Sequence, residues 1–191
     1  MSKAKYLLDV NVFIALLSEN HIHHRLVTAW FNTPDLKWAI CPFTEAGFLR
    51  NATAPRPGQI SISEATAVLA RIAGAPGYHY LPITADWQTL CSPFFPRLYG
   101  TKQVTDAYLL GLAVRDGLML VTMDKAIMHL AGNERSKQVL PYVLLRFLKP
   151  DRTMESAQSV PFCSLPGDIL KLGCGVCLML KYRMELANFH V

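Results

Sequence analysis

Short apolar runs alternate with longer amphipathic segments along this chain, and each kind predicts a different element. Three of the runs, 6–8, 38–41 and 118–122, have the length and apolar character of buried strands. The run 118–122 is almost continuously apolar, which is typical of a strand buried on both faces of a parallel sheet. Helical patterns lie between the strands. We therefore expect an α/β domain with a central, mostly parallel sheet flanked by helices.

Start and stop signals place most of the helices. Pro42 takes the favoured first-turn position of a helix that carries Glu45. Ser61 and Glu64 form a capping-box pattern, and Gly117 ends the strongest helical segment. The expected helices cover 12–17, 26–31, 42–50, 61–74, a segment capped by Thr84 that includes Trp87 and Leu90, 105–114, and a short segment ending at Leu130. The expected strands cover 6–8, 38–41, 78–83, 118–122 and 139–140.

Two other segments carry residues with candidate chemistry. The histidines at positions 21, 23 and 24 could bind a metal ion, but no Cys or second His pair follows at ligand spacing. A solvated helix start is therefore favoured there. Segment 92–100 is expected to be a long irregular loop, rich in aromatic residues and containing Arg97. Such residues could stack on unpaired bases, although packing of the loop onto the core is favoured.

Composition narrows the class of protein. The chain has 191 residues, of which 51% are hydrophobic, and this suits one globular domain with an appendage. No apolar run approaches the roughly 20 residues of a transmembrane helix, and Asp9 and Asn11 interrupt what could be a signal peptide. Five cysteines at scattered spacings argue against a disulfide framework, so a reducing cytoplasm is expected. The net charge of +5 favours a polyanionic partner.

Acidic residues stand at the ends of several predicted elements. Asp9 follows the first strand, Glu45 lies in the helix after the second, Asp106 opens the helix before the late apolar strand, and Asp124 follows that strand. Each alone has an ordinary explanation as a helix cap or first-turn charge. In a parallel sheet with right-handed crossovers, however, strand ends and the helix starts that follow them share one edge. The place of Asp106 is less directly fixed, because its helix is entered from a long loop.

Four carboxylates at one edge would repel one another unless a cation is bound. Oxygen ligands select hard ions such as Mg²⁺ or Mn²⁺. A metal of this kind lowers the pKa of a bound water and stabilises charge on a transferring phosphoryl group, so the site would support phosphodiester hydrolysis. No Walker motif, GxGxxG motif or Ser or Cys nucleophile elbow occurs in the sequence to suggest another chemistry.

Four blocks of sequence resemble PIN domains, in particular the VapC-type toxins of bacterial toxin–antitoxin pairs. The blocks are 8–16, 44–50, 103–113 and 121–127, with Met123 where many relatives have Phe. The resemblance implies a three-layer α/β/α PIN-like fold and a metal-dependent endoribonuclease. It also implies a homodimer and a cognate antitoxin protein that silences the RNA-cleaving activity.

The same resemblance assigns roles to individual residues. Asp9, Glu45, Asp106 and Asp124 would be the catalytic residues and the ligands of Mg²⁺ or Mn²⁺. The side chains of Asn11 and Thr122 would support them.

The resemblance covers about 6–147, which predicts a nuclease domain over 1–148 and an extension of unknown role over 149–191. A disordered tail or a loosely packed helix over 169–186 is expected in the extension. Its Cys174 and Cys177 have CxxC spacing, but a single pair is weak support for zinc.

Two other functions fit parts of the pattern. A catalytically silent RNA-binding or interaction module could keep the fold, although acids at all four positions argue against it. A phosphoacceptor receiver domain also places Asp at strand ends. It usually has an acidic pair after its first strand, whereas here Val10 and Asn11 follow Asp9.

Overall fold

The computed structural model describes residues 4–141, and the predicted extension with its cysteine pair lies outside this part. Within it, strands and helices alternate along the chain as expected. The strands are β1 (Tyr6–Leu8), β2 (Trp38–Ile40), β3 (Tyr78–Tyr80), β4 (Met119–Thr122) and β5 (Val139–Pro141). The α-helices are α1 (Val10–Leu17), α2 (His24–Phe31), α3 (Pro42–Ala52), α4 (Ile62–Ala73), α5 (Trp87–Cys91), α6 (Val104–Asp116) and α7 (Ala126–Arg135). Three 3-10 helices, η1 (Ser92–Arg97), η2 (Thr101–Gln103) and η3 (Ser136–Gln138), complete the set.

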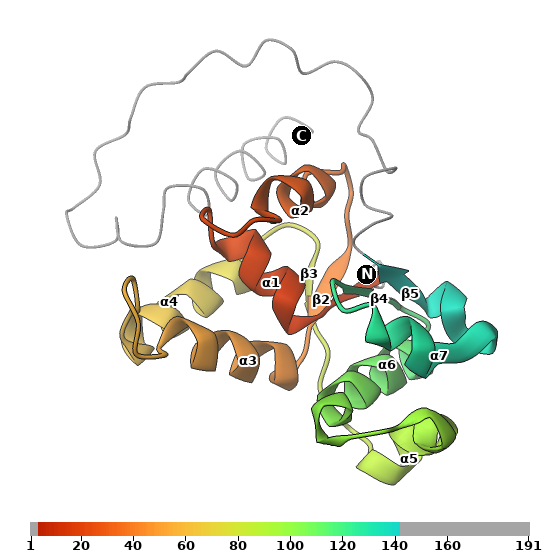
Figure 1. The fold of residues 1–191 in the computed structure, drawn as a ribbon. Coiled ribbons are helices and arrows are strands. Elements are labelled where there is room, and N and C mark those ends of the chain that lie inside the picture. The colour runs from red at the N-terminus through yellow and green to blue at the C-terminus, as the bar shows by residue number, and fades with distance from the viewer. Residues whose placement is uncertain (1–3, 142–191) are drawn as a thin grey trace, which may run out of the picture.

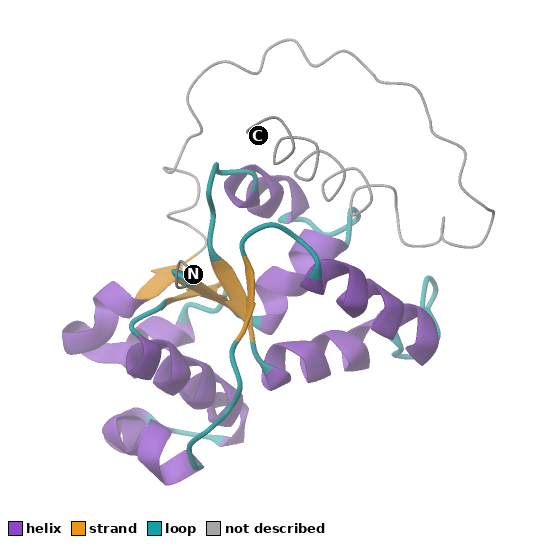
Figure 2. Ribbon diagram, turned by 180° about the vertical axis from the view of Figure 1, so that it is seen from behind, coloured by secondary structure: helices purple, strands orange, loops and turns teal. Residues whose placement is uncertain are grey.

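The strands form one sheet in the order β3-β2-β1-β4-β5, and all four neighbouring pairs are parallel. Helices cover both faces, with α1 to α4 on one side and α5 to α7 on the other (Figures 1 and 2). The expected three-layer α/β/α architecture is thus confirmed, and the sheet of the described residues is entirely parallel. Since all strands point the same way, their carboxyl ends meet at one edge.

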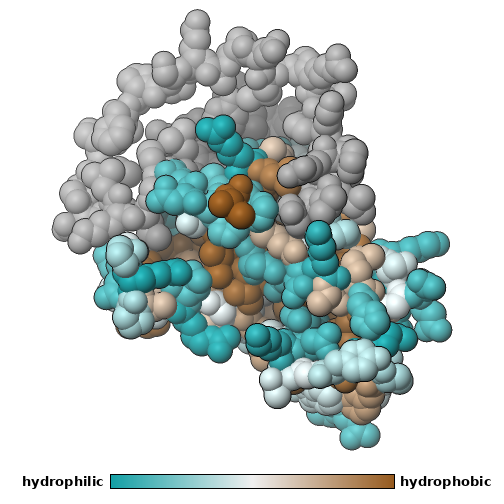
Figure 3. Space-filling view, viewed as in Figure 1, coloured by the Kyte–Doolittle hydropathy of each residue, from teal (hydrophilic) through white to brown (hydrophobic). Residues whose placement is uncertain are grey.

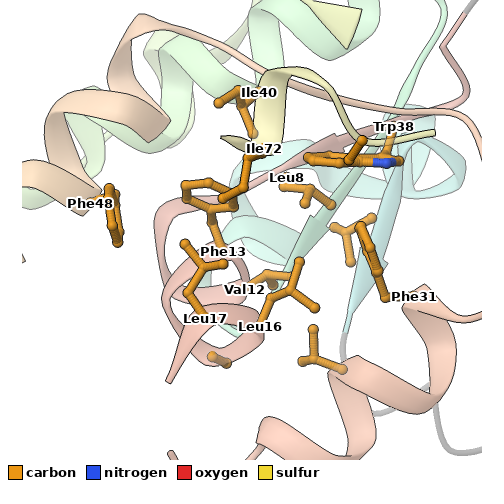
Figure 4. Packing of buried hydrophobic residues seen from close by; sticks show 14 of the residues in the cluster. Leu8, Val12, Phe13, Leu16, Leu17, Phe31, Trp38, Ile40, Phe48 and Ile72 are labelled. Carbon is orange, nitrogen blue, oxygen red and sulfur yellow. The ribbon is translucent and has the colours of Figure 1, made fainter. Parts of the chain in front are cut away.

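Alternation along the strands builds two hydrophobic cores. Leu8 and Val121 point to the layer of α1 to α4, whereas Leu7 and Leu120 point to the layer of α5 to α7. In the first core, Phe13 of α1 lies among side chains from β1, β2 and α3 (Figure 4). Every one of these strand residues is buried, which explains why the runs read as continuously apolar.

The helix boundaries follow local signals. Pro42 is in the first turn of α3, and Ser61 and Glu64 form a complete capping box at α4. Gly117 ends α6 in the left-handed conformation, at φ 65°, that glycine adopts without strain. Gly111 lets α5 approach α6, because a Cβ at this position would stand 2.6 Å from the carbonyl oxygen of Leu90. The helix starts expected at Pro42 and at Ser61 with Glu64, and the helix end expected at Gly117, are confirmed.

Four expected boundaries need correction. The third strand ends at Tyr80 instead of Ile83, because its partner β2 ends at Ile40, and the Leu81 N–H makes the last ladder bond to the Ile40 carbonyl. Asp86, not Thr84, caps α5: its Oδ1 accepts a 2.8 Å hydrogen bond from the Thr89 N–H. The Thr84 hydroxyl instead accepts one from Arg115.

The other two corrections concern irregular segments. Most of the expected loop 92–100 is the 3-10 helix η1, which the fully buried Phe94 anchors in the core. Helix α7 continues past Leu130 to Arg135, through a kink at Gly132, where φ is 63°. None of the helices in the described residues combines the length and apolar character needed to cross a bilayer.

Candidate active site

Asp9 occupies the turn between β1 and α1 at the carboxyl edge of the sheet. Its side chain is 5% exposed. One oxygen, Oδ1, accepts a 2.6 Å bond from the Val10 N–H, and the other, Oδ2, accepts a 2.6 Å bond from the Thr122 hydroxyl. Burial raises the pKa of Asp9, and the charge of Asp124 adds to this, while the bonds from Thr122 and Val10 oppose it. Asp9 is therefore a buried acid whose charge needs further compensation.

Asn11 and Thr122 hold the segment after β4 against the start of α1. The Asn11 Oδ1 accepts a 3.1 Å bond from the Met123 N–H. The Thr122 hydroxyl, which donates to Asp9, accepts a 3.0 Å bond from the Asp124 N–H. Both residues thus fix the segment that carries Asp124, and Thr122 also contacts Asp9; their supporting role in the active site stays a prediction of the family resemblance.

Asp124 and Asp106 reach the same place from different elements. Asp124 follows β4, is exposed, and accepts a 2.7 Å bond from the Ala126 N–H through Oδ1. Asp106 lies in the first turn of α6, which runs back toward β4 and so begins at the carboxyl edge. Burial, followed by the charges of Asp9 and Asp124, raises the pKa of Asp106 to about 6. The structure therefore brings these three acids within electrostatic reach of one another.

Asp106 does not cap its helix. It is the third residue of α6, the N-cap position belongs to Gln103, and no side chain makes the capping bond there. The ordinary explanation of this acid as a cap is wrong. Its half-buried carboxylate lies in the first turn of α6, where the helix dipole favours a negative charge.

Glu45 lies in the first turn of α3 and faces β3. Its Oε2 accepts a 3.2 Å bond from the Tyr80 hydroxyl. Burial, and then the charge of Glu45, raises the pKa of Tyr78 to about 12. Glu45 is not among the charges that raise the pKa of Asp9 or Asp106. It therefore flanks the three clustered acids on the β3 side instead of sharing their field.

Two residues next to the acids are not among the site residues expected from the sequence. Thr44 is fully buried, and its hydroxyl donates a 2.8 Å bond to the Leu8 carbonyl. Because Glu45 follows Thr44 and Asp9 follows Leu8, this bond fixes one acid-bearing segment against the other. Tyr80 stood inside an expected strand, where its contact with Glu45 depends on the pairing of β3 with β2. The sequence indicated only that Tyr78 and Tyr80, two residues apart in an expected strand, share one face of the sheet.

The donor chemistry of the cluster suits a hard divalent cation. Asp9, Asp106 and Asp124 offer only carboxylate oxygens, and their mutual repulsion is the force a cation would relieve. Among residues 4–141, no three His, Cys, Asp or Glu side chains are arranged to hold one ion between them. Mg²⁺ commonly takes one or two protein carboxylates and keeps several waters, so a site of this openness fits it better than a closed cage would.

The histidine segment is engaged in local structure. The His24 imidazole donates from Nδ1 to the Ala15 carbonyl at 2.8 Å, and His21 accepts a bond from the His23 N–H at 3.2 Å. Burial, and then the charges of His23 and His24, lowers the pKa of His21. These contacts join α2 to α1 and lie away from the acids in sequence and in the fold (Figure 1).

Comparison with known proteins agrees with the fold. The family model of the PIN domain matches residues 6–133. Three relatives come from Mycobacterium tuberculosis. Ribonuclease VapC38 is 44% identical over 128 residues, covering 65% of this chain and 89% of its own. Ribonuclease VapC44 is 38% identical over 136 residues, covering 70% and 96%. Ribonuclease VapC39 is 36% identical over 124 residues, covering 63% and 89%. The chain thus belongs to the PIN-domain family and, within it, to the VapC-type ribonucleases.

Proposed function

We propose that the protein is a metal-dependent endoribonuclease that hydrolyses RNA phosphodiester bonds at the carboxyl edge of its sheet. The observation that carries the proposal is the convergence of Asp9, Asp106 and Asp124 from three elements at the carboxyl edge of the sheet. The charge of Asp124 raises the pKa of Asp9, and the charges of Asp9 and Asp124 raise the pKa of Asp106. Perturbed carboxylates gathered in this way are typical of active sites. The names of the relatives, all ribonucleases, point to the same reaction.

Each acid has a part in this proposal. Asp9 and Asp106, the more buried pair, would hold Mg²⁺ or Mn²⁺, with Asp124 and Glu45 completing the pocket on either side. Such an ion supplies a water of lowered pKa and stabilises charge on the phosphoryl group. Thr122 and Asn11 hold Asp9 and the segment of Asp124 next to each other through the hydrogen bonds described above. Asp124, which is exposed, is the acid best placed to exchange protons with solvent.

The direct test is cleavage of total RNA by the purified protein with Mn²⁺, with Mn²⁺ plus chelator, and with Asp106→Asn. Cleavage that needs both the ion and Asp106 supports the proposal. If RNA stays intact under all three conditions but is bound, the protein is instead a catalytically silent RNA-binding module with the same fold.

We further propose that the protein is the toxin of a type II toxin–antitoxin pair. Figure 3 shows hydrophobic surface in the region of α1, bordered by hydrophilic residues. Ile22, in the turn between α1 and α2, is 87% exposed, and Ile62, at the start of α4, is 59% exposed. An apolar helix of the antitoxin would dock beside α1 and α3, and an Arg or Lys near it would reach the acids, because a guanidinium pairs well with carboxylates.

Co-expression with the genomic neighbour of this chain tests the pairing. The neighbour should relieve toxicity, and replacing its cation should weaken inhibition while binding is retained. A chain that is harmless without any partner contradicts the toxin proposal. The expected homodimer is tested separately, by light scattering of the purified chain.

A further inference from the structure

Tyr80 ends β3 at the carboxyl edge, and the hydrophobic core does not use its ring. In the β2–β3 register it pairs with Ile40, next to the start of α3. Tyr78, two residues earlier on the same face, packs edge-on against Trp38 with ring centroids 5.3 Å apart. The Tyr80 side chain is 46% exposed, and β3 is the edge strand of the sheet. A large ring is therefore left open beside the candidate active site.

The ring is nevertheless held in place at both ends. Its backbone belongs to the β2–β3 ladder, and its hydroxyl donates a 3.2 Å bond to Glu45 Oε2. Glu45 is itself positioned through its neighbour Thr44, which bonds to the last carbonyl of β1. An exposed aromatic ring that is already ordered loses little conformational entropy when a flat ligand stacks on it.

We propose that Tyr80 is a substrate-binding residue, whose ring stacks on an unpaired RNA base next to the phosphate that is cleaved. The inference rests on the proposed ribonuclease function and identifies a residue that contacts a base of the RNA. Proteins that read unpaired RNA commonly stack splayed bases on Tyr or Phe, whereas a base inside a duplex offers no free face. The bond to Glu45 places the ring beside an acid that flanks the candidate active site.

A structural alternative makes a different prediction. If Tyr80 serves only to tie α3 to β3, the hydroxyl carries the effect and the ring does not. Tyr80→Phe removes the hydroxyl alone, and Tyr80→Leu removes the ring while keeping apolar bulk. The pair separates the two explanations.

The experiment measures binding of a fluorescent single-stranded RNA by anisotropy, in full-length protein carrying Asp106→Asn so that RNA stays intact. Tyr80→Leu should weaken binding roughly 5- to 150-fold, the range typical of one lost base stack. Tyr80→Phe should stay within about 2-fold, since the π-face is kept. Equal losses in both variants, or no loss in Tyr80→Leu, overturn the proposal.

A scan with RNAs that lack one base at a time locates the contact. At one position of the RNA, removing the base should weaken binding to the protein that keeps Tyr80. The same removal should not change the affinity of the Tyr80→Leu variant. The same loss in both proteins at every position would overturn stacking. Phe95→Leu is the matched control: Phe95 is 42% exposed, but it stacks on Trp87 with ring centroids 5.0 Å apart, and its replacement should not change RNA affinity.

The two proposals fail in distinguishable ways. Wild-type protein that binds RNA through Tyr80 but does not cleave it refutes the nuclease function and leaves the stacking contact in place. If the wild-type protein cleaves RNA and the Tyr80→Leu variant has the same KM and the same RNA affinity, the stacking contact alone is refuted.

Discussion

The hydroxyl of Thr122 donates a 2.6 Å hydrogen bond to Oδ2 of Asp9, across 113 positions of sequence. The Thr122 hydroxyl oxygen in turn accepts a 3.0 Å bond from the Asp124 N–H. One buried side chain from β4 thus sets the position of an acid after β1 and of an acid after its own strand.

Thr122→Val should therefore lower RNA cleavage about 10- to 100-fold, the usual effect of losing a partner that orients a ligand. Thr122→Ser keeps the hydroxyl and should restore most of the activity. Initial rates at saturating Mn²⁺ test this expectation. Equal activity in the Val variant and the wild type would show that Asp9 needs no such support.

Asp106→Asn should reduce cleavage by orders of magnitude, because the substitution removes a charge from the proposed metal site. It should not destabilise α6, since Asp106 makes no capping bond. Cleavage of a fluorogenic RNA and thermal melting, measured together, test the two halves of this prediction. Wild-type turnover in the variant would remove Asp106 from the site.

The pKa of Asp106, raised to about 6, predicts a pH dependence of stability in metal-free protein. Since the folded-state pKa lies above the unfolded value, Asp106 favours folding at low pH, and this contribution is lost as the pH rises through about 6. The melting temperature of Asp106→Asn should therefore rise relative to wild type between about pH 4 and pH 7. A difference that is constant over this range would contradict the raised pKa of Asp106, which burial and then the charges of Asp9 and Asp124 produce.

Mn²⁺ or Mg²⁺ should raise the melting temperature by binding only the folded protein. At 100 times the dissociation constant the gain is about 2.7 kcal/mol, and it should shrink in Asp9→Asn. Ca²⁺ and Zn²⁺ serve as comparison ions in the same scanning experiment. An unchanged melting curve at millimolar Mn²⁺ would count against a site of useful affinity.

Thr44→Val should destabilise the fold by about 1–3 kcal/mol, because the buried Leu8 carbonyl loses its side-chain donor. Thr44→Ser is the control and should stay close to wild type. Urea unfolding followed by circular dichroism gives both values. If the Val variant is as stable as the Ser variant, the bond contributes no net stability.

The predicted boundary at 148 can be tested with a chain that ends at Pro150. This chain should fold and keep nuclease activity, because the family match ends at residue 133. A soluble but inactive product would assign 151–191 a part in RNA binding or catalysis. An insoluble one would mean that this segment covers apolar surface of the domain.

Local patterns in the sequence specify the order and kind of most elements, because strands buried on two faces and helix caps each leave a recognisable run of residues. Leu118–Thr122 reads as a buried strand, and Ser61 with Glu64 begins a helix, whatever surrounds them. The sequence also specifies which acids stand at element ends, and the four family blocks that contain them.

Which of those acids meet depends on the packing of elements that are distant in the sequence. Asp9, Asp106 and Asp124 are brought together because β1 and β4 are neighbours in the sheet, whereas Glu45 is drawn toward β3 by its bond to Tyr80. The contacts of Thr44 and Tyr80 depend on strand pairing between residues distant in the chain, for which local periodicity carries no signal. The cap at Asp86 was missed for a related reason, since Thr84 is engaged by Arg115 from a different helix.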